Sequence, residues 1–306
     1  SKGSDVPQGP AGPDGGGVAV AEPPKVPTGR SASVRDDIEI PEPPFWGDRV
    51  VEGIDIKQVY PFMNTSALFK TQWQFIRGDM DSKAYNDQLE HEVKPIFERL
   101  KQELTEQDVL HPKVTYGYFP CNSDPNNPEV LIVYDPEDQD KEIERFTWPR
   151  QTRQKGLCIS DFFLPAGRGQ KDVLPVQCVT VGNKVSEVAG ELFKANNYKE
   201  YLYIHGMGVE SAEALAEMWH KRIRQELGIA TEDASKVTQL FTQKYRGSRY
   251  SFGYPACPEM SDQDKLWRLI DPTRIGCVLT ENWQIDPEQS TSAIICHHPQ
   301  AKYFNT

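Results

Sequence analysis

The sequence predicts an α+β fold, in which a single domain is built on a mostly antiparallel, twisted sheet flanked by helices. The main observation is that β-like runs and amphipathic helical runs occur in mixed groups rather than in strict alternation, which disfavours a doubly wound parallel sheet. The chain has 306 residues, of which 38% are apolar and 26% are charged. These values are typical of a globular protein that is large enough to bury a core.

The first 36 residues differ in composition from the rest of the chain. Segments such as Gly9–Pro13 and Gly15–Gly17 are rich in glycine and proline, and such segments bury too little apolar surface to become ordered. The sequence therefore predicts a flexible interdomain linker over residues 1–36 and a folded domain over 37–306. A linker in this position also suggests a module that is tethered to something larger.

Four stretches have helical patterns. Over 85–104 apolar residues recur at three- and four-residue spacing, so we expect an amphipathic helix that is kinked or restarted at Pro95. Asn183 is positioned to cap a second helix. A long helix is expected over about 208–226, and a short one over 266–270.

The strand candidates are short runs rich in β-branched and aromatic residues. They lie at 114–119, 130–134, 176–181, 275–279 and 293–296. The first two are separated by a segment rich in Asn, Asp and Pro, which indicates that they pair as neighbouring strands.

Charge and cysteine usage exclude several classes of protein. The formal net charge of −11 argues against a nucleic-acid partner, because phosphate recognition normally requires a basic surface. No stretch approaches the roughly 20 apolar residues that span a bilayer, and no signal peptide is recognisable, so we expect a cytoplasmic protein without membrane contact. The six cysteines form no CxxC pair and do not lie at zinc-finger spacing from histidines. We interpret them as reduced, mostly buried thiols and expect no metal site.

The segment 249–258 is the most informative part of the sequence. Two prolines bracket Ala256 and Cys257, which favours an extended and rigid loop. Arg249 could hold a carboxylate with two hydrogen bonds, Gly253 would let the backbone approach a ligand closely, and an aromatic face attracts cationic groups such as a sulfonium. A loop that only packs over the sheet, with Arg249 in an ordinary salt bridge, fits the same residues.

The run from Arg249 to Glu259 has the pattern RxxxGYPACPE, which resembles the signature loop of the reactivation domain of cobalamin-dependent methionine synthases. Other segments are similar to the same family, namely Pro41–Gly47, Asn64–Phe69, Gln72–Phe75, Phe119–Asn122, Ile159–Phe162 and His298–Phe304. The resemblance covers about 38–306 and implies the α+β fold of that activation domain.

The resemblance implies a binding site for S-adenosylmethionine and no catalytic residue. The matching ligand-binding positions are Asn64, Glu213, Arg249, Tyr250, Ser251, Gly253, Tyr303 and Phe304. Arg249 matches the arginine at the methionine end of the ligand, and Tyr254 matches a tyrosine expected near the cobalamin face. Asn64 stands where some members have an aspartate, so its contact with an ammonium group would be weaker. Glu213 would also fit a solvated position on a helix.

In function, the resemblance implies a rescue step in which inactive cob(II)alamin is reduced and methylated. Flavodoxin or methionine synthase reductase would supply the electron, and S-adenosylmethionine would supply the methyl group. The chain lacks a DxHxxG sequence, which provides the lower cobalt ligand, so cobalamin would be held by a neighbouring domain of the same enzyme. We expect a monomeric module that does not turn over alone.

Two alternatives belong to other classes. In the first, Tyr201–His205 followed by Gly206-Met207-Gly208 would be the strand and glycine turn of an independent, Rossmann-like methyltransferase. No third glycine follows, and the segment fits the end of one helix and the start of another better. In the second, the chain is a docking module for the electron-transfer partner that binds no ligand. Direct measurement of ligand binding distinguishes this docking module from the ligand-binding reactivation module.

Overall fold

The computed structural model describes residues 29–152 and 155–306. Most of the expected linker, residues 1–28, lies outside the described residues. The remaining part, 29–36, packs against the domain, which corrects the expected boundary at residue 37. Val34 is buried in a hydrophobic core, and the Arg30 guanidinium donates a hydrogen bond of 2.8 Å to the carbonyl oxygen of Phe163.

A seven-stranded sheet forms the centre of the molecule, and every pairing within it is antiparallel. The strands are β1 (Gly47–Val51), β2 (Lys113–Ser123), β3 (Val130–Tyr134), β4 (Glu142–Thr147), β5 (Asp172–Thr180), β6 (Ser248–Tyr250) and β9 (Ser290–Cys296). Their order is β4-β3-β2-β5-β9-β6, and β1 pairs with β2. This confirms the predicted α+β fold and the predicted pairing of the strands around 114–119 and 130–134.

The expected strand over 275–279 is wrong in its first half. Ile275 ends a 3-10 turn, η7 (Pro272–Ile275), and Gly276 adopts a positive φ of 84° that an extended strand does not allow. Only β7 (Val278–Leu279) is extended, and it pairs with β8 (Ile285–Asp286) in a separate hairpin.

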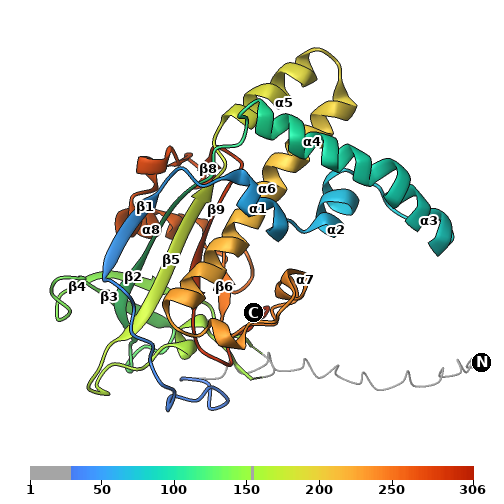
Figure 1. Ribbon diagram of the computed structural model, residues 1–306. Helices are drawn as coiled ribbons and strands as arrows, with labels where there is room; N and C mark the ends of the chain where they lie inside the picture. Colours follow the sequence, from blue (N-terminus) through green and yellow to red (C-terminus); the bar gives the residue numbers. More distant parts are fainter. Residues whose placement is uncertain (1–28, 153–154) are drawn as a thin grey trace, which may run out of the picture.

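The long helix α6 (Tyr198–Glu226) runs across one face of the sheet (Figure 1). It begins ten residues before the expected start at 208, because the Asn197 side chain caps it by accepting a hydrogen bond from the backbone N–H of Glu200. The segment 201–208 therefore lies inside one continuous helix. This excludes the strand and glycine turn of the Rossmann alternative, and it also corrects the expectation of two separate helices.

The two glycines inside α6 allow close packing. A Cβ atom on Gly206 would lie 2.8 Å from the indole Nε1 of Trp73, and one on Gly208 would lie 2.9 Å from Cγ of Gln289. The Trp73 Nε1 also donates a hydrogen bond of 3.1 Å to the carbonyl oxygen of Tyr203. Glycine at position 206 thus lets the segment before α3 lie directly on the long helix.

The helices that precede α6 in the chain cover its side of the sheet or project from it (Figure 1). They are α1 (Ile56–Val59), η1 (Tyr60–Phe62), α2 (Thr65–Ala67), η2 (Leu68–Gln72), α3 (Ser82–Gln88), η3 (Leu89–Val93), α4 (Lys94–Glu106) and α5 (Lys184–Lys194). The helical stretch predicted over 85–104 is confirmed. A π-helical turn, η3, lies immediately before α4, and Pro95 occupies the first turn of α4, where proline is tolerated.

Two hydrophobic cores lie on opposite faces of the sheet. Strand β2 shows the alternation, because Tyr116 and Tyr118 belong to the core under α6, whereas Phe119 and Cys121 belong to the second core. The second core is closed by α8 (Gln263–Ile270) and by loops, including η4 (Ile159–Phe162) and η6 (Met260–Asp262). The short elements η5 (Ala230–Glu232) and α7 (Val237–Leu240) follow α6.

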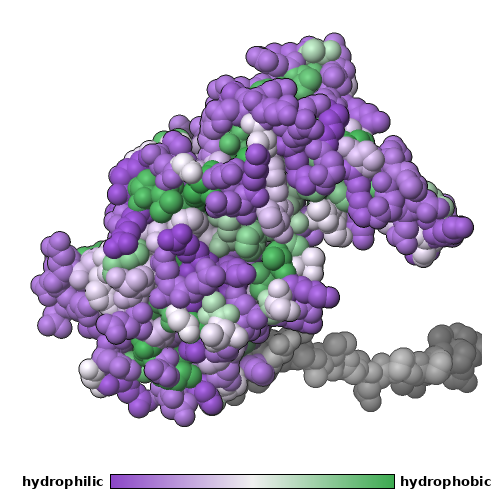
Figure 2. Space-filling model, in the orientation of Figure 1, coloured by the Kyte–Doolittle hydropathy of each residue, from purple (hydrophilic) through white to green (hydrophobic). Residues whose placement is uncertain are grey.

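The surface seen in Figure 2 is mainly hydrophilic, and its hydrophobic residues form small, separate patches. Among the described helices, none is both long enough and apolar enough to cross a membrane.

Candidate functional site

Three adjoining cavities follow α6 and the outer edge of the sheet. The inner cavity, of about 270 Å³, is lined by Phe62, Asn64, Ala67, Glu210, Glu213, Ala214, Glu217, Phe241 and Arg249. The middle cavity, of about 250 Å³, shares Glu213, Glu217, Phe241 and Arg249 with it and adds Leu240, Gln243, Tyr245, Ser251, Tyr254, Thr291 and Tyr303. The outer cavity, of about 410 Å³, shares Ser251, Tyr254 and Thr291 with the middle one and continues to Phe252, Met260, Gln263, Gln284, Ile285, Glu288, Ser290 and Ser292. Together they provide the volume of a small-molecule site.

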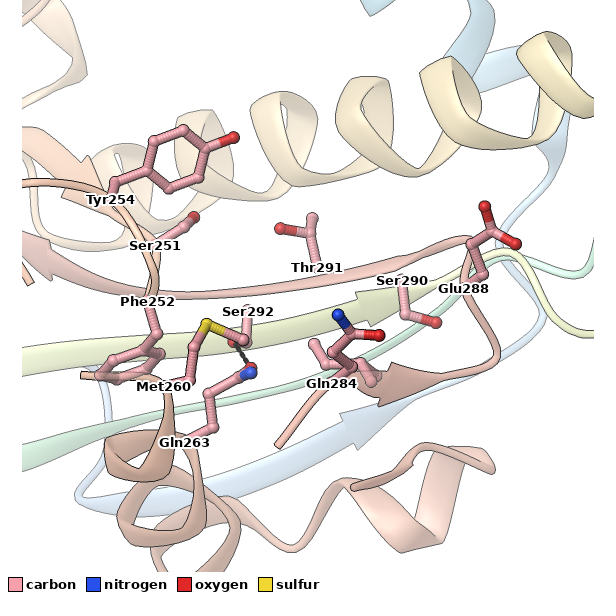
Figure 3. A pocket seen from close by; sticks show the side chains of 11 residues that line it. Ser251, Phe252, Tyr254, Met260, Gln263, Gln284, Glu288, Ser290, Thr291 and Ser292 are labelled. Atoms are coloured by element: carbon pink, nitrogen blue, oxygen red, sulfur yellow. Dashed lines mark hydrogen bonds between the residues drawn. The ribbon is translucent and has the colours of Figure 1, made fainter. Parts of the chain in front are cut away.

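The outer cavity follows the edge of β9. Strand β6 pairs only with Ile294–Cys296, so within the described residues no strand pairs with the outer edge of β9 from Ser290 to Ala293. Figure 3 shows Thr291 pointing towards the long helix, with Ser251 and Tyr254 on the same side of the strand. Met260 and Gln263 lie on the other side, where Gln263 accepts a hydrogen bond of 2.8 Å from the Ser292 hydroxyl.

Arg249 lies where the inner and middle cavities meet. It is the central residue of β6, and its Nη1 donates a hydrogen bond of 2.7 Å to Oε2 of Glu217 on α6. Burial by itself would lower the pKa of Arg249, but the charge and hydrogen bond of Glu217, together with Tyr245 and Glu213, raise it above its ordinary value. The side chain keeps 21% of its surface exposed, so the guanidinium can still receive a ligand.

His220 lies beside this ion pair and stays uncharged. Its Nδ1 is 3.5 Å from Nη1 of Arg249, and the side chain is fully buried. Burial, followed by the charges of Arg224 and Arg249, lowers the pKa of His220 well below its ordinary value. Arg249 is therefore the cation at this point of the site.

Asn64 has a structural role as well as a place in the inner cavity. Its side-chain oxygen accepts a hydrogen bond of 3.1 Å from the backbone N–H of Ala67 and so caps α2. Glu213 lies one helical turn before Glu217 on the exposed side of α6 and lines both the inner and the middle cavity.

The segment after Arg249 forms a fixed turn. Gly253 has a positive φ of 89°, and a Cβ atom there would lie 2.6 Å from the sulfur of Met260, so both the backbone and the packing require glycine. Cys257 closes the turn, since its thiol donates to the carbonyl oxygen of Ser251 and its carbonyl oxygen accepts from the N–H of Gly253. Tyr254, 59% exposed, stands at the rim of the cavities.

Tyr250 and Phe304 do not line any of the three cavities. Alternate residues of a strand point to opposite faces, so Tyr250 points away from Arg249 into the second core, where it packs edge-on against Phe304 at 5.9 Å between ring centres. Of the two closing aromatics, only Tyr303 lines the middle cavity, and 40% of it is exposed. The structure therefore brings together Asn64, Glu213, Arg249, Ser251, Tyr254 and Tyr303.

Sequence reasoning missed Glu210, Glu217 and Thr291. Glu210 and Glu217 lie three residues before and four residues after Glu213, a spacing that puts all three on one face of a helix. That spacing was a usable signal once the helix was recognised. Thr291 gave no signal, because its position depends on the unpaired edge of β9.

The described parts of the chain contain no group of three or more histidine, cysteine or acidic side chains that could hold a metal ion. All six cysteines are buried, and none forms a disulfide bond.

Comparisons with known proteins agree on one family. The family model "Vitamin B12 dependent methionine synthase, activation domain" matches residues 55–306. Methionine synthase from Mycobacterium tuberculosis (strain ATCC 25618 / H37Rv) is 42% identical over 300 residues, which are 94% of this chain and 25% of that protein. Methionine synthase from Mycobacterium leprae (strain TN) is 41% identical over 94% of this chain and 24% of its own length. The chain thus spans about a quarter of the length of these relatives.

A solved structure, the crystal structure of the MetH reactivation domain bound to AdoHcy, superimposes with a TM-score of 0.77 and 25% sequence identity. The match covers 88% of this chain and 83% of that one. Both the sequence match and the fold therefore point to the same domain, and the chain belongs to the activation-domain family of vitamin B12-dependent methionine synthases.

Proposed function

We propose that the chain is the S-adenosylmethionine-binding reactivation module of a cobalamin-dependent methionine synthase. The module binds S-adenosylmethionine in the three adjoining cavities and presents the methyl group to cob(II)alamin, which a neighbouring domain of the same enzyme holds. Flavodoxin or a methionine synthase reductase supplies the electron. The module, which consists of residues 37–306 and the packed segment 29–36, acts as a monomeric unit of the larger enzyme in the cytoplasm. The family match and the solved relative with bound AdoHcy support this proposal.

The observation that carries the proposal is the position of Arg249 between the two inner cavities. A guanidinium that is mostly buried, held by one carboxylate and still partly accessible, suits the α-carboxylate of the ligand's methionine part. From there the middle and outer cavities lead past Ser251 and Thr291 to the exposed Tyr254. The ligand would therefore lie along an open groove, where its methyl group can meet a cobalamin that arrives from outside.

The chemistry of the step requires positioning from this chain. Cobalamin, held by the neighbouring domain, would supply a reduced cobalt nucleophile for the methyl group once it had received an electron. This chain would hold S-adenosylmethionine with its methyl group facing outward, and the S–C electron pair would stay on sulfur when the methyl group is transferred, which would leave S-adenosylhomocysteine. Because no proton moves, the step needs alignment of the methyl group with cobalt and no acid–base group.

Calorimetric titration of S-adenosylmethionine into the purified chain tests the proposal. We expect saturable binding that Arg249→Ala weakens by at least tenfold, or about 1.4 kcal/mol. Arg249→Lys keeps a positive charge next to Glu217 but removes the two-pronged hydrogen bonding, so it should fold and still lose affinity.

Arg246→Ala is the matched control, because Arg246 belongs to the same segment but donates to the carbonyl oxygen of His297, outside the cavities. Circular dichroism would verify that each variant is folded. Equal binding by the Arg249 variants and the Arg246 control would show that another group anchors the carboxylate. A folded wild-type chain that does not bind S-adenosylmethionine would refute the ligand assignment and favour a docking module.

A further inference from the structure

The segment 29–36, which was expected to belong to the linker, is bound to the domain by several separate contacts. The Ser31 hydroxyl donates a hydrogen bond of 2.6 Å to the carbonyl oxygen of Lys155, in addition to the bond that Arg30 donates to the domain. Ser31 and Val34 are both only 7% exposed. We call residues 29–36 the N-terminal clip.

The N-terminal clip lies against residues 297–306, which we call the C-terminal strap. The side-chain amide of Gln300 contacts the clip twice. Its Oε1 accepts a hydrogen bond of 2.9 Å from the backbone N–H of Arg35, and its Nε2 donates one of 2.9 Å to the carbonyl oxygen of Ser33. One side chain of the strap thus bonds to the backbone of the clip in the way that a neighbouring strand would.

His298 adds a third bond between the strap and the clip. Its Nδ1 accepts a hydrogen bond of 3.0 Å from the N–H of Gln300, so the neutral ring carries its proton on Nε2. That Nε2 donates a bond of 2.9 Å to the carbonyl oxygen of Arg35. Burial lowers the pKa of His298 to about 4, so the ring is neutral near pH 7. Gln300 and His298 therefore hold both backbone groups of one clip residue.

The C-terminal strap continues from these contacts into the middle cavity. Tyr303 lines that cavity, and its N–H donates a hydrogen bond of 3.2 Å to the side-chain oxygen of Gln243, another lining residue. Three residues span at most about 11 Å when extended, so a displacement of Gln300 reaches Tyr303. Phe304 is buried in the second core and anchors the end of the strap. Release of the clip should therefore loosen the strap without detaching it.

The N-terminal clip can open without unfolding the domain. Its eight residues, 29–36, belong to neither a helix nor a strand, and Val34 is the one member of the clip in a hydrophobic core. Conformational entropy opposes the ordering of every one of these residues. Segments with few buried apolar contacts open locally at a low cost in free energy.

We propose that the N-terminal clip controls the ligand site through the C-terminal strap. The docked clip keeps Tyr303 in place at the middle cavity, and release of the clip lowers the affinity for S-adenosylmethionine. This inference rests on the proposed function and adds a means of regulating that site. In the sequence the clip directly follows the segment rich in glycine and proline. A movement of the neighbouring domain would therefore reach the clip before any other part of the module, and the site would hold its ligand tightly while the clip is docked.

Two variants of the full 306-residue chain should open the clip from its two sides. Val34→Asp places a charge in the second core and leaves the strap unchanged, whereas Gln300→Glu replaces the donor to Ser33 by an anionic oxygen. Calorimetry should show that each variant binds S-adenosylmethionine at least about fivefold more weakly, a typical size for coupling between two sites. Hydrogen exchange, followed by mass spectrometry, should be faster at the Tyr303 amide in both variants.

Arg35→Ala is the matched control within the clip. It removes an exposed side chain that pairs with Asp37, but it keeps the backbone groups that bind Gln300 and His298. Its affinity for S-adenosylmethionine should equal that of the wild type. Circular dichroism would verify that each variant is folded.

Coupling between two sites is reciprocal, so the wild-type chain provides a second test. Saturating S-adenosylmethionine should slow hydrogen exchange at the Arg35 amide, which donates to Gln300. This measurement decides the result if Val34→Asp does not fold. Wild-type affinity in either folded variant, or exchange at Arg35 that the ligand does not change, would overturn the inference and leave the proposed function intact. A wild-type chain that does not bind S-adenosylmethionine would overturn both.

Discussion

Replacement of Gly206 by alanine tests how α6 is packed against the rest of the domain. On an exposed helix this change stabilises the fold by about 1 kcal/mol, because alanine has the higher helix propensity. At position 206 the new Cβ would lie 2.8 Å from Nε1 of Trp73 and 2.9 Å from Cβ of Gln72. Real Cβ atoms do not approach neighbours so closely, so either the indole or the helix must move.

The expected cost follows from these contacts. Overpacking of a well-packed core costs about 1–3 kcal/mol, and displacement of the indole would also weaken its hydrogen bond to the carbonyl oxygen of Tyr203, worth about 1 kcal/mol. After the gain in helix propensity is subtracted, Gly206→Ala should destabilise the domain by roughly 1–3 kcal/mol. At about 3 °C per kcal/mol for a domain of this size, the melting temperature should fall by roughly 3–9 °C.

Urea denaturation followed by circular dichroism would measure this change. Gly190→Ala is the matched control, because Gly190 also lies within a helix, α5, but a Cβ atom there would meet nothing within 4 Å. The control should be unchanged or more stable by up to about 1 kcal/mol. If Gly206→Ala were as stable as Gly190→Ala, the close approach of Trp73 to α6 would not exist in solution.

Two other predictions concern buried carboxylates. Asp161→Asn should destabilise the domain by about 3–5 kcal/mol, because the fully buried Asp161 receives two hydrogen bonds from the buried Arg150 guanidinium, which would keep only the partly exposed Glu129 as a counter-charge. A urea midpoint equal to that of the wild type would contradict this. Burial raises the pKa of Glu210 to about 7, so its stabilising contribution is complete below pH 4.5 and is lost as the pH rises through about 7. The free energy of unfolding of Glu210→Gln should therefore exceed that of the wild type by up to about 3 kcal/mol at pH 8 and be similar to it near pH 5. The same difference in the free energy of unfolding at both pH values would refute the raised pKa of Glu210.

Local patterns predicted much of the fold but placed the long helix incorrectly. The helices over 85–104 and 266–270 and the paired strands around 114–119 and 130–134 were recognised, because their apolar spacing is strong. The start of α6 was missed because Gly206 and Gly208 were interpreted as a break, since glycine weakens an isolated helix. In the structure the same glycines are required by contacts with Trp73 and Gln289, which lie far away in the sequence.

The candidate site was predictable only in part, for a similar reason. The family resemblance pointed to Arg249 and its loop, but it could not show which side chains face the cavities. Arg249 and Tyr250 are neighbours on a strand, and strand alternation sends one to the site and the other to the core. Arg249 and Glu217 are 32 residues apart in the sequence and belong to different elements, so only the tertiary fold brings them into contact.

The open edge of β9 also affects how the domain behaves at high concentration. From Ser290 to Ala293 the outer backbone groups have no partner strand within the described residues, and an unpaired strand edge can recruit a strand from another molecule. The edge is short and Glu288 lies just before it, two features that natural proteins use to discourage such association. A ligand or partner in the outer cavity would cover the same edge, so occupancy of the groove would also protect the domain against self-association.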